Sequence, residues 1–319
     1  MKLPIFRVLR PGFLSTLQDG GRRGVMHQGL AEGGALDLPA LHWANRMLDN
    51  PPEATAIEIT LGGLQVEVLD AADIALTGAD AGCQLGDRPL ANWETHRVEP
   101  GQILRFGHAR DGLRSYLAVA GGLVGRAPTI PRERLGGLND DGSPLTCADR
   151  LDRQRRPGLL TCRRLVPPPL RPPGGDDGEH TITMDFLHGG QWDALPEDTR
   201  RSLTNASWTI RSDSDRMAVR LAGPALSSLP GIRSEPIAPG TIQLPPDGQP
   251  ILLMADRQTL GGYAVAGWLT PTSLAQLAQL RPGRAIKLRI TDERTARTRW
   301  LQQSHVGTSH ATGAAGRGM

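Results

Sequence analysis

The sequence predicts a mainly β protein of two domains with few helices. The chain has 319 residues, which exceeds the usual size of a single hydrophobic core. It contains 39 glycines and 26 prolines, about a fifth of all residues, without the strict period of collagen. Short apolar runs between frequent turn residues favour strands over helices. Residues 166–180 are rich in proline and glycine, and we expect them to be a linker between two strand-rich halves.

The first half, residues 1–165, is predicted to be a β-rich domain with one helix. This helix begins at the N-cap Asp37 and ends near Leu48, before two prolines. Asn45 lies on its apolar face, and a buried asparagine needs hydrogen-bond partners. It either ties down a neighbouring loop, which we favour, or lines a cleft. The expected strands are Ile5–Leu9, Leu64–Leu69, Ile74–Thr77, Ile103–Phe106 and Leu113–Val119.

The second half, residues 181–302, is also predicted to be rich in strands. One helix is expected from the cap at Thr270 to about Leu280. Residues 303–319 lack periodicity, and we expect a disordered tail there. The expected strands are Thr181–Phe186, Trp208–Arg211, Thr241–Leu244, Ile251–Ala255 and Ala285–Ile290.

Charge and composition exclude several classes of function. The net charge is +3 and the arginines and acids are interspersed, so no nucleic-acid surface is indicated. Lys2 and Lys287 are the only lysines, so the chain has neither the Gly-Lys-Ser/Thr of a P-loop nor the lysine of a biotin carrier. A nucleotide would therefore be held in another way or by a partner.

Motifs for metal binding, a serine triad and membrane insertion are missing from the sequence. The eight histidines form no pair with metal-ligand spacing, and no Gly-x-Ser-x-Gly elbow occurs. Cys83, Cys147 and Cys162 are odd in number and are expected to be reduced thiols. No apolar run is long enough to span a membrane and the N-terminus lacks a signal-peptide core, so we expect a cytoplasmic protein.

The segment from Gly240 to Tyr263 is the most informative part of the sequence. It predicts a hairpin whose Pro-Pro-Asp-Gly turn obtains its positive φ from Gly248. Polar side chains that follow a strand directly, beside a Gly-Gly bend, are typical of a binding site. The alternative is that they cap the strand and pair with one another. These residues are Asp256, Arg257, Gln258 and Thr259.

The side chains of this segment suit a small ligand with a carboxylate or a carbonyl group. Arg257 offers a planar donor fork, and the amide of Gln258 offers both a donor and an acceptor. Arg216 has an acid beside it and is either functional or an ion-paired anchor. Gln243 is either a satisfied edge residue or a ligand contact that lines a barrel. Tyr263 either closes a pocket or packs under the Gly-Gly bend.

Seven motifs in fixed order along residues 5–290 resemble the KipA family. That family comprises the C subunit of bacterial 5-oxoprolinase and the second half of the carboxyltransferase module of urea carboxylases. The resemblance implies cyclophilin-like β-barrel domains, and it adds Asn45, Arg114 and Ser115 to the candidate substrate-binding residues. The motifs are Pro11–Gly24, Gly34–Asp37 with Ala44 and Asn45, Glu58–Thr60, Leu76–Asp80, Arg114–Gly122, Ser214–Gly223 and Gly240–Tyr263.

The resemblance implies the C subunit of an ATP-dependent 5-oxoprolinase. Such a complex converts 5-oxo-L-proline to L-glutamate together with a LamB/YcsF-like A subunit and a KipI-like B subunit. Opening a lactam is unfavourable under mild conditions, so coupling to ATP is chemically reasonable, and arginine and amide donors suit a polarised ring carbonyl. We expect no covalently bound cofactor, and we expect the isolated chain to be inactive.

Two alternative functions stay open. One is a subunit of a biotin-dependent carboxyltransferase, as in urea carboxylase, with the biotin on another chain. The other is a non-enzymatic protein that binds a KipI-like partner and so regulates a sensor kinase. In residues 125–149, prolines and charges replace the Gly-Ser-Arg-Ser-Thr stretch of the family, which puts any chemistry of those hydroxyls in doubt. We expect a mobile loop near the cleft there.

Overall fold

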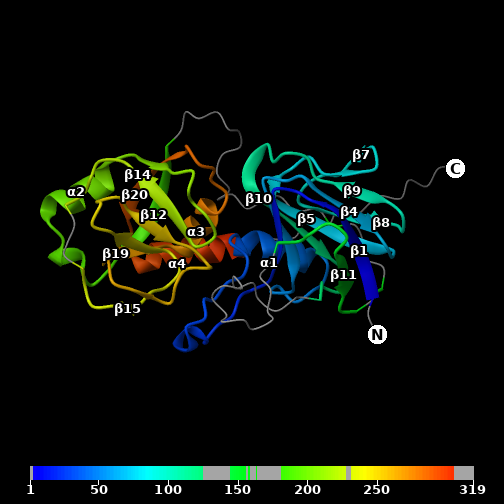
Figure 1. The fold of residues 1–319 in the computed structure, drawn as a ribbon, viewed down its shortest axis with the longest axis horizontal. Coiled ribbons are helices and arrows are strands. Elements are labelled where there is room, and N and C mark those ends of the chain that lie inside the picture. The colour runs from blue at the N-terminus through cyan, green and yellow to red at the C-terminus, as the bar shows by residue number, and fades with distance from the viewer. Residues whose placement is uncertain are drawn as a thin grey trace.

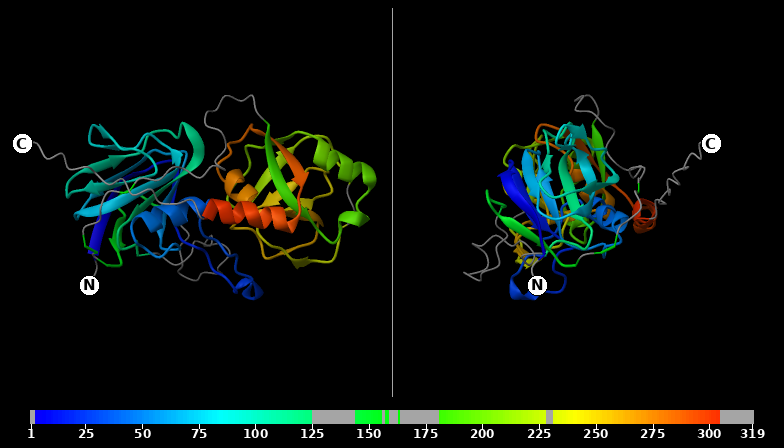
Figure 2. Two further views of the ribbon diagram at one scale, coloured as in Figure 1. Left: turned by 180° about the vertical axis from the view of Figure 1, so that it is seen from behind. Right: turned by 90° about the vertical axis from the view of Figure 1, so that its right-hand side faces the viewer.

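The computed structural model describes residues 3–124, 144–155, 157–158, 163, 181–227 and 231–304. Two β-rich bodies lie side by side, the first from blue to green and the second from green to red (Figure 1). Helix α1 (Leu38–Met47) lies where the two bodies meet in both Figure 1 and Figure 2. The predicted mainly β class with few helices is confirmed.

The first domain consists of two antiparallel sheets. A six-stranded sheet has the order β11-β1-β4-β9-β6-β7, and a five-stranded sheet has the order β2-β3-β10-β5-β8. The strands of the six-stranded sheet are β1 (Leu3–Pro11), β4 (Leu64–Val68), β6 (Gln84–Leu85), β7 (Arg88–Pro89), β9 (Ile103–Arg105) and β11 (Arg150–Arg153). The strands of the five-stranded sheet are β2 (Leu14–Gln18), β3 (Ala56–Thr60), β5 (Ala72–Asp80), β8 (Glu94–Val98) and β10 (Asp111–Val119).

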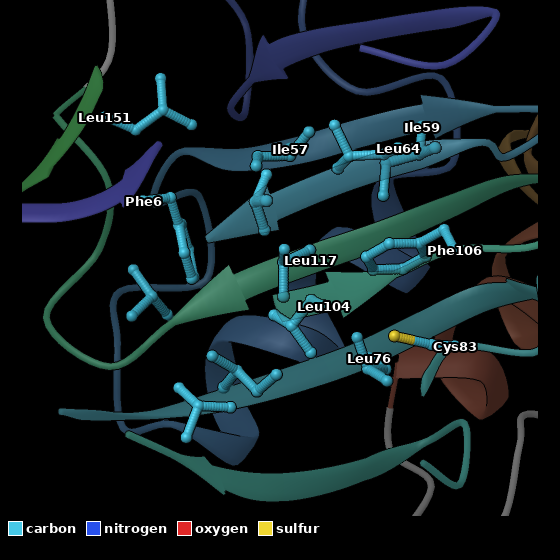
Figure 3. Close-up of a cluster of buried hydrophobic side chains, with 14 of the residues drawn as sticks. Phe6, Ile57, Ile59, Leu64, Leu76, Cys83, Leu104, Phe106, Leu117 and Leu151 are labelled. Carbon is cyan, nitrogen blue, oxygen red and sulfur yellow. The ribbon is translucent and has the colours of Figure 1, made fainter. Parts of the chain in front are cut away.

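Aliphatic side chains from both sheets form the core of the first domain (Figure 3). Because successive residues of a strand point to opposite faces, Ile57 and Ile59 of β3 and Leu117 of β10 enter this core. Cys83 is buried in the same core, and burial raises the pKa of its thiol to about 12. This thiol is therefore protonated and unreactive at neutral pH.

Helix α1 covers the other face of the five-stranded sheet. Its N-cap is Asp37, as predicted, and the Asp37 carboxylate accepts a hydrogen bond of 3.1 Å from the Ala40 amide. The helix packs on Tyr116 and on other residues of the sheet that face away from the core. Strand β3 is consequently covered on both faces, and all five of its residues are buried. This burial places Glu58, in the middle of β3, beneath the helix layer.

The second domain is a closed barrel with the strand order β12-β19-β16-β17-β14-β13-β20. Strands β12 and β20 pair in parallel, and the other pairs are antiparallel. A two-stranded flap of β15 (Glu235–Pro236) and β18 (Leu260–Gly261) lies outside the barrel. The barrel strands are β12 (Ile182–His188), β13 (Trp208–Ile210), β14 (Ala218–Ala222), β16 (Thr241–Leu244), β17 (Ile251–Leu253), β19 (Ala264–Leu269) and β20 (Ala285–Ile290).

Three helices accompany the barrel: α2 (Glu197–Asn205), α3 (Pro271–Leu277) and α4 (Glu293–Ser304). Helix α3 has the predicted cap, because the Thr270 hydroxyl accepts a hydrogen bond from the Ser273 amide. The expectation of a single helix in this half was wrong. Helices α2 and α4 are mostly polar, and α4 extends into the first two residues of the predicted tail. Short 3-10 turns occur at Met26–Gln28 and Trp192–Ala194.

The predicted hairpin is confirmed. Strand β16 pairs with β17, and Gly248 in the turn has a φ of 72°. The linker prediction for residues 166–180 lies outside the described residues. Of the segment 125–149, only residues 144–149 are described, and Leu145 anchors them to the first domain, because it is buried and its amide donates to the Ser15 carbonyl. Within the described ranges, no helix is long and apolar enough to cross a membrane.

The close approach of β5 and β10 gives a test of this packing. Gly78 has a φ of 77°, and a β-carbon there would lie 2.3 Å from the Arg114 carbonyl oxygen. Gly101 has a φ of 82° but has free space around it. We expect Gly101→Ala to cost about 1 to 2 kcal/mol of unfolding free energy from backbone strain alone. Gly78→Ala should cost about 1 to 3 kcal/mol more because of the collision. Urea denaturation measures both costs, and equal costs would contradict the packing.

Candidate functional site

Four charged side chains form an ion network between the two domains, which we call the interdomain network. Arg216 lies just before β14, and its guanidinium binds Asp256 with two hydrogen bonds of 2.8 and 3.0 Å. The same guanidinium donates to Glu58 of the first domain at 2.5 Å and to the Gly34 carbonyl at 2.6 Å. Arg114 of β10 lies 3.7 Å from Glu58. With two cations and two carboxylates the network is neutral, as buried charges require.

Glu58 is the centre of this network and is 1% exposed. Its second oxygen accepts hydrogen bonds from the Tyr116 hydroxyl at 2.8 Å and the Leu36 amide at 2.9 Å. Burial alone would raise the pKa of Glu58, but the charges of Arg216 and Arg114 and these hydrogen bonds hold it below the usual 4.5. Burial and the neighbouring carboxylate raise the pKa of Tyr116 well above its usual range. Glu58 is therefore ionised and Tyr116 protonated at neutral pH.

A second contact between the domains involves the end of α3. The Gln279 side chain accepts hydrogen bonds from the Leu113 and Arg114 amides at 3.0 and 2.9 Å, and it donates to Asp37 at 2.7 Å. Arg281 donates to the Gly112 carbonyl at 3.1 Å. The start of β10 is thus bound to the second domain by main-chain and side-chain hydrogen bonds. The two domains are held at a defined orientation by polar groups that are buried and paired.

Arg257 is buried and contacts the long loop that joins β2 to α1. Its side chain is 1% exposed, and its Nε donates to the Ile237 carbonyl at 3.0 Å. One terminal nitrogen lies 3.4 Å from Glu32 of that loop, while the other is buried and has no partner among the described residues. Burial lowers the pKa of Arg257. The guanidinium therefore belongs to the packing between the loop and the barrel, and it lines neither of the two cavities described below.

A cavity of about 290 Å³ lies on the outside of the barrel, and we call it the outer-face cavity. Inward residues of β14, β16 and β17 fill the barrel, so the outward residues of the same strands form the cavity wall. Three residues predicted from the sequence meet here: Gln243, Gln258 and Tyr263. The other lining residues are Asp215, Met217, Ala218, Arg220, Pro245, Asp247, Ile251 and Leu253.

A second cavity of about 250 Å³ lies between the domains, beneath the loop that joins β2 to α1. Its walls are mainly apolar, with Leu36 and Leu38 from the first domain and Met254 and Leu274 from the second. Glu32 also lines it and connects it to Arg257. The short segment 254–258 thus lines both cavities. Met254 and Ala255 line the cavity between the domains, and Gln258 lines the outer-face cavity.

The remaining predicted residues are placed away from the outer-face cavity. Asn45 is fully buried, and its side chain bonds to Asn50 and to the carbonyls of Pro52 and Ala54, so it ties down the loop after α1. The Ser115 hydroxyl donates to the Ala79 carbonyl at 2.8 Å. Thr259 lies beside the flap, and its carbonyl accepts a hydrogen bond from the Ile237 amide.

Sequence reasoning missed the central carboxylate and several cavity residues. Glu58 belongs to one of the seven motifs, but the sequence alone gives it no role. A glutamate between Ile57 and Ile59 on an apolar strand nevertheless indicates a buried charge. Asp215 and Arg220 come close to Gln258 only through the pairing of β14 with β17, which no local pattern predicts. No group of three or more His, Cys, Asp or Glu side chains suited to a metal occurs in the part of the chain that the structure describes.

The two-domain β architecture, with polar residues gathered at the end of β17, is that of a carboxyltransferase-like protein. The chain belongs to the family described as carboxyltransferase domain, subdomain A and B, which matches residues 28–290. The resemblance to the KipA family is thereby confirmed.

Curated relatives support this membership. The chain is 34% identical over 297 residues to the 5-oxoprolinase C subunit of Escherichia coli, covering 88% of this chain and 90% of that protein. It is 33% identical to the 5-oxoprolinase C subunit of Haemophilus influenzae, covering 86% and 87%. Urea amidolyase of Lachancea kluyveri is 28% identical over 88% of this chain, but that match covers 17% of the longer protein.

Solved structures show the same fold. The crystal structure of TTHA0988 superposes with a TM-score of 0.79 at 31% identity, covering 90% of this chain and 55% of that one. The urea amidolyase of K. lactis superposes with a TM-score of 0.81 at 24% identity, covering 97% of this chain and 20% of that one. The chain thus spans about half of TTHA0988 and a fifth of urea amidolyase.

The pH dependence of folding tests the interdomain network. Glu58→Gln removes the carboxylate charge that compensates Arg216, and breaking a buried ion pair costs roughly 3 to 5 kcal/mol. Because the folded-state pKa of Glu58 is lowered, its contribution is complete above pH 4.5 and decreases as the pH falls below that value. The difference in unfolding free energy between wild type and variant should therefore be largest near pH 7 and should narrow in acid.

The matched control is Glu67→Gln, which removes a partly exposed ion pair with Arg7. Exposed pairs contribute about 1 kcal/mol or less. Urea denaturation at several pH values measures both variants. Similar costs for the two variants at pH 7 would contradict the central role of Glu58.

Arg257→Lys tests whether Arg257 is structural. Lysine keeps the charge but cannot donate to both Ile237 and Glu32, so we expect a loss of about 1.5 to 3 kcal/mol of unfolding free energy. The control is Arg201→Lys at an exposed pair with Glu197, for which we expect a change within about 0.5 kcal/mol. Unchanged stability of Arg257→Lys would restore the interpretation of Arg257 as a ligand-binding residue.

Proposed function

We propose that the chain is the C subunit of an ATP-dependent 5-oxoprolinase complex. The observation that carries this proposal is the match to two proteins named as the C subunit of 5-oxoprolinase, over nearly their whole lengths. In the proposed reaction, water adds across the lactam C–N bond of 5-oxo-L-proline and gives L-glutamate. Hydrolysis of ATP by the complex drives this step, and no cofactor is bound covalently.

The composition of the chain supports a role as one subunit among several. It has no P-loop sequence for ATP, and its buried charges are used in holding the two domains together. We propose that a KipI-like B subunit and a LamB/YcsF-like A subunit complete the active complex in the cytoplasm. The isolated chain is then inactive and contributes the binding of a small molecule.

The outer-face cavity is the part of this chain best suited to that role. Its volume of about 290 Å³ lies near the lower end for small-molecule sites. Amide, phenol and guanidinium groups from Gln258, Tyr263 and Arg220 reach it. Such groups fix the orientation of a small polar ligand on a rigid scaffold.

A second candidate is a subunit of a biotin-dependent carboxyltransferase. The family description and the match to urea amidolyase favour it. In that case biotin is carried by another chain, and the small acceptor of the carboxyl group binds here.

Reconstitution of the complex tests the proposal. The chain should co-purify with its KipI-like partner, and addition of the LamB/YcsF-like subunit should give glutamate release from 5-oxo-L-proline that depends on ATP. Each protein alone should show no turnover. Robust turnover by this chain alone would contradict its role as a dependent subunit. An assembled complex that transfers carboxyl groups from carboxybiotin, without releasing glutamate, would favour the second candidate.

A further inference from the structure

The outer-face cavity contains polar groups that the described residues do not satisfy. We propose that it recognises a small cyclic amide, with the Nε2 group of Gln243 donating to the ring carbonyl oxygen. This inference rests on the proposed function in naming 5-oxo-L-proline as the ligand. The donor and the acceptors of the cavity, however, suit an amide group independently of that name.

Gln243 is the strongest indication that the cavity binds a ligand. Its side chain is 1% exposed, and its Nε2 has no hydrogen-bond partner among the described residues. Its backbone is fixed in the barrel by pairing with Ile251 and Val265, so its side chain extends from a fixed position on the wall of the outer-face cavity. A buried N–H group without an acceptor costs stability, and such groups are rare unless a ligand or water satisfies them.

Gly261 of the flap makes room for this amide. A β-carbon at Gly261 would lie 2.4 Å from Gln243 Nε2 and 3.1 Å from Ile237 Cδ1. Any side chain at this position would therefore push the amide away from its place. Gly261 of β18 therefore packs directly against the amide of Gln243 in β16. The flap covers this amide but accepts no hydrogen bond from it.

Further polar groups that reach the cavity keep hydrogen-bonding capacity for a ligand. The Asp215 Oδ1 atom is held by the Met217 and Ala218 amides at 2.8 and 3.0 Å, and this leaves Oδ2 as an acceptor. The side chains of Gln258 and Tyr263 make no hydrogen bond to any other described residue. The cavity thus offers a donor for a carbonyl and acceptors for an N–H group, which is the pattern of a cyclic amide.

The charges of the residues that line the cavity favour a neutral amide over a simple anion. Asp215 and Asp247 face one cation, Arg220, so the lining carries a formal charge of −1. A carboxylate deep in this site would be repelled. The Arg220 side chain is about half exposed and lies 3.8 Å from Asp213 in a loose ion pair, so it keeps donors for a ligand carboxylate at the mouth while a neutral amide lies inside. Ile251 and Leu253 offer apolar contacts for ring methylenes.

A cyclic urea presents the same carbonyl and N–H pattern, so the test must separate the two rings. Binding to the isolated chain is measured by saturation-transfer NMR and calorimetry with 5-oxo-L-proline, 2-pyrrolidinone, L-proline and 2-imidazolidinone. We expect 5-oxo-L-proline to bind most tightly, 2-pyrrolidinone more weakly for want of the carboxylate, and L-proline not at all. Preferential binding of 2-imidazolidinone would overturn the assignment to a lactam.

Two variants test the role of Gln243. Gln243→Met keeps the volume but removes the unsatisfied donor, so it should weaken binding at least tenfold while raising the melting temperature of the ligand-free chain. Gly261→Ala should weaken binding by displacing the amide. The matched control is Gln18→Met, because Gln18 is equally buried but lies in the first domain and donates to Thr16. It should leave binding unchanged.

The outcomes distinguish this inference from the proposed function. Wild-type affinity in Gln243→Met, or binding of L-proline as tight as that of 5-oxo-L-proline, overturns the inference. If the assembled complex carrying Gln243→Met releases glutamate with an unchanged KM, the inference fails and the proposed function stands. If the chain binds the lactam in a manner sensitive to Gln243 but the assembled complex releases no glutamate, the inference is supported and the proposed function fails.

Discussion

The guanidinium of Arg216 is the interaction on which the arrangement of the two domains depends. It is buried, and it binds Asp256 of its own domain together with Glu58 and the Gly34 carbonyl of the other. Burial alone would lower the pKa of Arg216, but the two carboxylates raise it above its usual value, so the charge is permanent. A buried cation of this kind is tolerated only while all of its partners stay in place. The orientation of the domains is therefore specified by charge pairing as well as by apolar contact.

Three consecutive residues near this network have different surroundings. Asp256 is used by Arg216, Arg257 packs against the loop before α1, and of the three only Gln258 reaches the outer-face cavity. The Asp256 amide donates to the Arg216 carbonyl and the two side chains pair, so the backbone just before Gln258 is held beside the interdomain network. The ion network thus anchors a segment that lines the outer-face cavity, although the charged side chains of the network do not line it.

The sequence predicted several local structures correctly, but it did not show which polar residues are buried. The hairpin, the cap at Asp37 and the cap at Thr270 follow from turn and capping chemistry within a few residues, and all three are present. Strand β3 was missed although Ile57, Glu58, Ile59 and Thr60 alternate between apolar and polar residues, and its complete burial follows only from the helix layer that covers the face of Glu58. The polar residues do follow directly after β17, but which of them are buried depends on the other domain.

Arg257 and Gln243 show why that division could not be predicted. Both are polar residues that end up almost completely buried, and each keeps one nitrogen without a partner among the described residues. An arginine fork next to a strand end suits a ligand, yet here the loop carrying Glu32 folds over it from 225 residues away in the sequence. Gln243, on an apolar strand, gave a weaker signal. It becomes significant only because the flap places a glycine against its amide, so that the group is covered but not bonded. The hydrogen-bonding groups that remain unpaired at the outer-face cavity are therefore decided by how the flap packs over Gln243.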